Sequence, residues 1–180
     1  MPEIIELDDV DALGAGAVGE PGKRAFYIQA RNETAQLTVL VEKEQVAMLA
    51  AEAVAFLDRI ADEFPEVPSV LSPVAAQLRE PTVPLFRARL IALGFDPERE
   101  LVLIEFRERA EDDDDEPDPP AVGSEGEGEG EGYVARIFAT RAQVRAMAAR
   151  GVEAVAGGRP PCSLCGRPMD PAGHRCPRWN

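Results

Sequence analysis

The chain contains one histidine, one tryptophan and three cysteines in 180 residues, and this scarcity restricts its chemistry. The single histidine, His174, lies among the cysteines, where it has the spacing of a metal ligand. No second histidine remains to act as a base for a serine or cysteine nucleophile. The composition therefore argues against hydrolase chemistry, and we favour a protein without catalytic activity.

Long apolar runs are also lacking. The longest mostly apolar run, residues 46–57, is interrupted by Glu52 and is too short to span a bilayer. The first nine residues are acidic and have neither the basic nor the apolar part of a secretory signal. We therefore expect no membrane association and a cytoplasmic location.

Lysine is scarce, and the charge of the chain is unevenly spread. The chain has only two lysines against seventeen arginines, and its net charge is −14. Residues 111–131 hold eleven acidic residues and no basic one, so the rest of the chain carries only −3, whereas residues 157–180 carry +3. The acidic balance disfavours wide contact with nucleic-acid phosphates, but a local contact by the basic tail stays open.

The acidic stretch 111–132 is of low complexity. It consists of an aspartate run, prolines and glutamate–glycine repeats, which offer no apolar surface to bury. We expect a disordered surface loop inserted in a single α+β domain, residues 1–156, which is followed by a tail, residues 157–180.

Hydrophobic periodicity predicts the elements of this domain. Apolar residues at three- and four-residue spacing from 46 to 64 indicate one helix, which Pro65 and Pro68 end. Thr140 and Gln143 form the capping box of a second helix, which extends to residue 156. Alternation and β-forming residues predict strands over residues 3–7, 25–30, 36–41, 85–93, 101–107 and 133–139, and residues 14–22 are predicted to be a loop.

The two halves of the chain share one order of elements: strand, strand, strand, helix. Residues 40–51 and 138–149 also align around a common Gln-Val pair. We therefore predict an internal β-β-β-α duplication, and a largely antiparallel sheet of about six strands with both helices on one face.

The tail carries the most specific motif. Cys162 and Cys165, followed by Gly166, have the spacing of a zinc knuckle, and His174 and Cys176 follow eight residues later. Three cysteines without an export signal favour a metal site over disulfides. Three sulfurs and one nitrogen make a tetrahedral set for zinc, so we predict a structural zinc site, the alternative being a reduced, metal-free tail.

A glycine-rich segment, residues 14–19, matches the dinucleotide-binding fingerprint in spacing. The fingerprint requires a helix directly afterwards, but Pro21 and a predicted strand follow instead. A turn is the favoured interpretation. A small-anion site formed by Gly19, Gly22, Lys23 and Arg24 remains as an alternative.

Three segments resemble a known family: residues 16–30, residues 42–46, and residues 160–178 with their Cys-x-x-Cys and His-x-Cys pairs. Together they resemble an actinobacterial family known as domain of unknown function 3090. The resemblance covers nearly the whole chain except the acidic insert. It implies no activity, substrate or catalytic residue.

These observations favour a non-catalytic, zinc-containing binding or regulatory protein with an unknown protein partner. One alternative is an enzyme with a small-anion or nucleotide site at the loop formed by residues 19–24. The other is a nucleic-acid-binding tail, in which Arg167, Arg175 and Arg178 contact phosphates and Trp179 stacks on a base.

Overall fold

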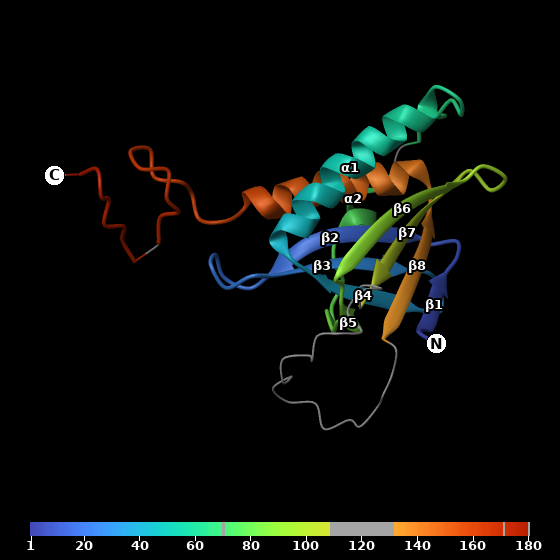
Figure 1. Ribbon diagram of the computed structural model, residues 1–180, viewed down its shortest axis with the longest axis horizontal. Coiled ribbons are helices and arrows are strands. Elements are labelled where there is room, and N and C mark those ends of the chain that lie inside the picture. The colour runs from blue at the N-terminus through green and yellow to red at the C-terminus, as the bar shows by residue number, and fades with distance from the viewer. Residues whose placement is uncertain (70, 109–131, 171, 180) are drawn as a thin grey trace.

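The computed structural model describes residues 1–69, 71–108, 132–170 and 172–179 (Figure 1). The predicted acidic insert, apart from Gly132, lies outside the described residues. In chain order the elements are β1 (Glu3–Leu7), β2 (Ala12–Val18), β3 (Ala25–Arg31), β4 (Gln36–Val41), α1 (Lys43–Ala61), the 3-10 turn η1 (Pro73–Ala76), β5 (Phe86–Arg87), β6 (Leu90–Asp96), β7 (Leu101–Arg107), β8 (Tyr133–Ala139) and α2 (Arg141–Ala156).

The strands form two four-stranded sheets, with the orders β1-β8-β7-β6 and β2-β3-β4-β5. Each is mixed, because β1 pairs with β8 and β5 pairs with β4 in parallel, whereas the other pairs are antiparallel. The α+β class is confirmed. The prediction of one sheet of about six strands is wrong, since the described residues form eight strands in two sheets.

The first cause of this error is β2, which the sequence predicted to be a loop because of its glycines. In the structure these glycines allow β2 to pack closely against the segment around Ala76 and Leu78, which follows α1. A Cβ atom at Gly14 would lie 2.8 Å from the carbonyl oxygen of Ala76, and one at Gly16 would lie 2.9 Å from Leu78 Cδ1. Glycine within a strand can mark such a close approach as well as a turn.

The second cause is a change of sheet within residues 85–93. The backbone N–H of Ala88 donates to Leu40 O at 2.9 Å, beside β4, whereas that of Arg89 donates to Arg107 O at 2.8 Å, beside β7. Two successive residues between β5 and β6 thus hydrogen-bond to different sheets. The hydrophobic pattern is continuous over residues 85–93 and therefore predicted one strand, whereas the structure has two, β5 and β6.

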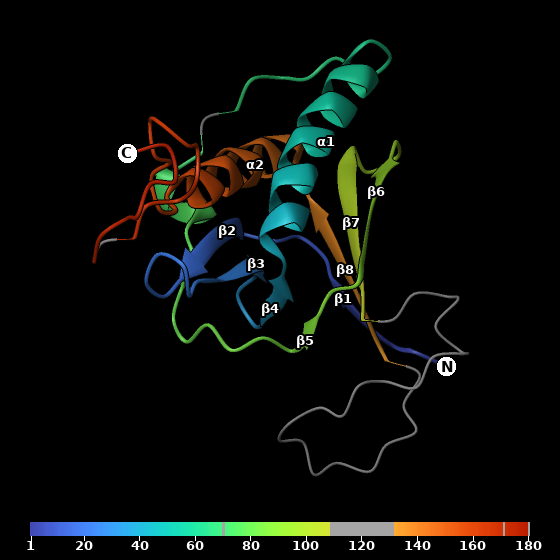
Figure 2. The same ribbon diagram turned by 60° about the vertical axis from the view of Figure 1, so that its left-hand side comes forward.

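One hydrophobic core joins both sheets and both helices. Figure 2 shows α1 and α2 crossing on the same side of β2, β3 and β4, with α1 running beside β6. The crossing is close because α2 has a glycine there: a Cβ atom at Gly151 would lie 3.1 Å from Val46 Cγ1 on α1 and 3.8 Å from Ala15 Cβ on β2. Neither helix is long and apolar enough to cross a membrane, as far as the chain is described.

Each helix begins with a capping box, and the two boxes make equivalent contacts, although only that of Thr140 and Gln143 was predicted from the sequence. Gln45 and Gln143 each accept the N–H of the residue before their helix at 2.8 Å, from Glu42 and Thr140 respectively. The amide nitrogen of Gln143 also donates to Val10 O in the segment after β1. That of Gln45 donates to Ala88 O, after β5, at 3.2 Å.

Glu105 on β7 is a charged side chain in a largely buried position, with 8% of its surface exposed. Burial raises the pKa of its carboxyl group, but hydrogen bonds from Arg136 Nε at 2.8 Å and Arg107 Nε at 2.7 Å outweigh this effect and hold the pKa below its ordinary value. A carboxyl group with a lowered pKa stabilises the fold above its ordinary pKa. That contribution is lost as the pH falls through the lowered value.

We therefore expect Glu105→Gln to lower the free energy of unfolding by about 1–2 kcal/mol at pH 7, allowing for the partial exposure of both arginines. The difference from the unmodified protein should shrink steadily below about pH 4.5, the ordinary range of a glutamate pKa. Urea unfolding at several pH values measures it, with the exposed Glu63→Gln as a control. A difference that does not depend on pH would show that the ion pairs are not its source.

Candidate metal centre

The first two cysteines lie in a short hairpin of the tail. Met169 N–H donates to Pro160 O, and Cys162 N–H donates to Arg167 O, both at 2.8 Å. The turn closes through Gly166, whose φ of 73° favours glycine and whose N–H donates to Cys162 O at 2.8 Å. The turn brings the two thiols of the Cys-x-x-Cys pair to the same side of the hairpin.

Two further turns return the chain to this hairpin. Gly173, with φ of 124°, donates its N–H to Asp170 O at 3.0 Å, directly before His174. After Cys176, a turn closes from Trp179 N–H to Cys176 O at 3.1 Å. Arg178 Nη1 then donates to Leu164 O at 3.2 Å, which ties the end of the described chain to the knuckle.

These turns bring together the four residues that the spacing predicted, and each residue offers one ligand atom. The ligand atoms of Cys162, Cys165, His174 and Cys176 all lie within 4.8 Å of one another. Cys162 Sγ and Cys176 Sγ are 3.9 Å apart, and Cys165 Sγ is 3.2 Å from His174 Nε2. The four residues are therefore positioned to bind one metal ion.

These distances suit a tetrahedral ion better than a disulfide. Metal–sulfur bonds of about 2.3 Å at tetrahedral angles place two sulfurs about 3.8 Å apart, and a sulfur and an imidazole nitrogen about 3.5 Å apart. The 3.9 Å separation of the sulfurs of Cys162 and Cys176 matches, and the 3.2 Å contact is only a few tenths of an ångström short. All three cysteines are free thiols.

The thiols differ in acidity. Backbone N–H groups of Cys165 and Leu164 point at the sulfur of Cys162 and lower the pKa of this thiol to about 6. Burial raises the pKa of the Cys176 thiol. Cys162 is thus ready to bind a cation as a thiolate at neutral pH, whereas Cys176 must release a proton when a metal binds.

The loop that was the alternative binding site connects β2 to β3. Gly19 and Gly22 have φ values of 112° and 94°, and the N–H of Lys23 donates to Glu20 O at 2.9 Å, so the loop is a tight turn. Gly22 and Arg24 line a small pocket of about 240 Å³. Gly19 and Lys23 do not line this pocket.

That pocket also contains Lys43 and Arg159, which the sequence did not single out as site residues. Lys43 begins α1 and Arg159 follows α2, so only the fold brings them to the turn.

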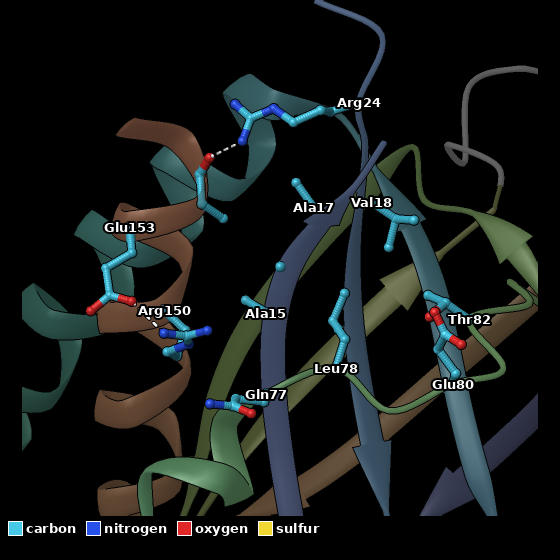
Figure 3. Close-up of a pocket in the computed structure, with 12 residues that line it drawn as sticks. Ala15, Ala17, Val18, Arg24, Gln77, Leu78, Glu80, Thr82, Arg150 and Glu153 are labelled. Carbon is cyan, nitrogen blue, oxygen red and sulfur yellow. Dashed lines mark hydrogen bonds and ion pairs between the residues drawn. The ribbon is translucent and has the colours of Figure 1, made fainter. Parts of the chain in front are cut away.

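A cleft of about 550 Å³ lies between β2, the segment 77–82 and α2 (Figure 3). Its charged lining has both signs: Arg24 and Arg150 with Glu80 and Glu153. Arg150 Nη1 contacts Glu153 Oε2 at 2.5 Å, and Arg24 turns toward the end of α2, where Nη1 donates to Ala154 O at 2.9 Å. None of the described residues lining the cleft is a histidine or a cysteine.

The fold and the site define an α+β protein with a C-terminal group of three cysteines and one histidine that is positioned for a metal ion. A sequence model of the family described as protein of unknown function (DUF3090) matches residues 5–176. The chain belongs to this family, as the resemblance of its sequence indicated. Comparisons with curated proteins and with solved structures found no match.

Proposed function

We propose that the chain is a non-catalytic, zinc-containing binding or regulatory protein whose tail presents a contact surface to a protein partner. The observation that carries this proposal is the convergence of four ligand atoms within 4.8 Å on a short tail. Three thiolates and one imidazole favour zinc over harder cations such as Mg²⁺ and Ca²⁺. A set of four protein ligands leaves no position for water or substrate, which supports a structural role.

The tail has few other means of holding its shape. Of its described residues only Cys162 is buried, and the hairpin is held by a few backbone hydrogen bonds. The free energy of metal binding would therefore be most of the folding free energy of the tail. On this proposal the metal orders the surface that the partner contacts.

That surface combines apolar and basic side chains. Leu164 is 52% exposed and Trp179 is 78% exposed. Arg167 and Arg175, also exposed, add positive charge. Tryptophan and arginine are enriched among the residues that dominate protein–protein binding, which supports a protein partner.

The test compares partners captured from the native cell by the intact protein and by the double variant Leu164→Ser/Trp179→Ser. Neither residue is a ligand, so the variant should keep its metal while losing the partner. Met48→Ser is the control, because Met48 is 67% exposed on α1, outside the tail. Capture of the same proteins by the tail variant would contradict the proposal.

Nucleic-acid binding through the tail is the second candidate, favoured by the exposure of Trp179 next to Arg178. Arg178 Nη1 donates a hydrogen bond to Leu164 O, so fewer N–H donors of its guanidinium group are available to phosphates. Fluorescence anisotropy with single-stranded RNA and DNA separates the two candidates. Binding that persists at physiological salt and weakens as the salt concentration rises would support nucleic acid, whereas no binding even at low salt would remove this candidate.

We also infer that the two halves arose by internal duplication. Each half contributes a three-stranded antiparallel meander followed by a helix, β2-β3-β4-α1 and β6-β7-β8-α2. In each sheet the short first strand of the other half adds in parallel, β5 on β4 and β1 on β8.

We also propose a cytoplasmic location and an actinobacterial source for the protein. The excess of arginine over lysine supports the source.

A further inference from the structure

The small pocket where the tail leaves α2 is cationic. Its charged lining residues are Arg24, Lys43 and Arg159, and no carboxylate group lines it among the described residues. They come from the β2–β3 turn, the start of α1 and the segment after α2. These three positive charges contrast with the net charge of −14 of the whole chain, of which residues 111–131 contribute −11.

Arg24 is held in place from two sides. Its Nη1 donates to Ala154 O at 2.9 Å, and its Cζ lies 5.2 Å from the centre of the Phe26 ring. These contacts leave Nη2 facing the space above Gly158. The guanidinium group is therefore fixed before any ligand arrives, which lowers the entropy cost of binding.

The other two cations are available to a ligand. Lys43 is exposed and has no ion pair or side-chain hydrogen bond within the described part of the chain. Arg159 Nη1 lies 3.2 Å from Asp170 Oδ2, but the Asp170 side chain is 57% exposed, so this pair is weak and open to exchange.

Two glycines make room for the three cations to converge. A Cβ atom at Gly158 would lie 3.1 Å from Arg24 Nη2 and 3.7 Å from Lys43 Nζ. One at Gly22 would lie 3.1 Å from Arg159 Cζ. The three cations thus line one pocket together with Phe26 and Pro168, and an anion placed there would offset their mutual repulsion.

We propose that this pocket binds the phosphate group of a phosphorylated ligand. Two guanidinium groups and an ammonium group match a dianion with several oxygens better than a single carboxylate. A volume of about 240 Å³ is larger than a phosphate group, so the pocket also has room for part of the group to which the phosphate is attached. This binding function is separate from the contact surface proposed for the tail.

The experiment is calorimetric titration of the full-length protein with inorganic phosphate and with phenyl phosphate, at constant ionic strength. We expect Lys43→Gln to weaken binding about tenfold, the typical effect of one charge-assisted hydrogen bond. Arg59→Gln is the matched control, because it removes one positive charge from the last turn of the same helix and should leave the affinity unchanged. Tighter binding of phenyl phosphate than of phosphate would favour an organic monoester, and the reverse order would favour the free ion.

Two outcomes would overturn the proposal: no heat of binding at about 20 mM phosphate, a concentration well above millimolar affinities, or equal weakening by Lys43→Gln and Arg59→Gln. Lys43 and Arg24 belong to the body and not to the tail, so their effect does not require a metal. If the protein proved to contain no zinc, an effect specific to Lys43 would still support the phosphate site.

Discussion

The Cys165→Ser variant is expected to lose its zinc while the body of the protein stays folded. A serine hydroxyl is a poor zinc ligand compared with a thiolate, and four-ligand structural sites bind zinc with about 10–16 kcal/mol. Loss of one ligand should weaken binding by about a thousandfold, so purification with a weak chelator should remove zinc from the variant and leave it in the unmodified protein. The core draws on both sheets and both helices and includes none of the three cysteines, so thermal unfolding of the body should change little.

The matched control is Ser163→Ala, which lies in the same knuckle, is exposed and is not a candidate ligand. Zinc per chain after gel filtration, measured beside far-ultraviolet circular dichroism, gives both readouts. A Cys165→Ser protein that kept a full equivalent of zinc would show that Cys165 is not a ligand. A variant that unfolded throughout would show that the tail is not separable from the domain.

Gly151→Leu is expected to have the largest effect on the fold. A Cβ atom at this position already meets Val46 Cγ1 at 3.1 Å, with Ala50 Cβ at 3.7 Å and Ala15 Cβ at 3.8 Å. The rest of a leucine side chain would have to push α1 away from α2 or α2 away from β2. Overpacking of this kind typically costs about 1–3 kcal/mol, and we expect about 3 kcal/mol because three elements meet here.

The control is Ala149→Leu, an exposed position on the same helix, which should alter the free energy of unfolding by less than about 0.5 kcal/mol. Urea denaturation measures both variants. Equal stability of Gly151→Leu and the unmodified protein would contradict the close crossing of the two helices. Gly151→Ala should fall between them, because its better helix propensity, about 1 kcal/mol, offsets part of the steric cost.

Sequence patterns were most reliable where local chemistry decides the structure. The two helices were predicted from their periodicity, and the second from its capping box as well, because capping involves residues only three apart. Strand β2 was missed because Gly14 and Gly16 read as turn residues. The structure explains these two glycines by the close approach of Ala76 and Leu78. Because these residues lie more than sixty positions away in the sequence, no local pattern reveals the contact.

The candidate sites show the same division. The Cys162–Cys165 and His174–Cys176 spacings predicted which residues gather in the tail, since short turns bring them together. Of the charged residues that line the cationic pocket, only Arg24 was predicted from the sequence. Arg24 was chosen from its loop, whereas Lys43 and Arg159 reach the pocket through the packing of α1 and α2, a tertiary feature.

We propose that Cys162, Cys165, His174 and Cys176 hold one zinc ion in the native protein. X-ray absorption at the zinc edge, on full-length protein purified without chelator or oxidant, tests it most directly. We expect about one zinc per chain, with three sulfur neighbours at about 2.3 Å and one nitrogen at about 2.0 Å. A protein without zinc, or a zinc ion surrounded only by oxygen and nitrogen, would contradict it.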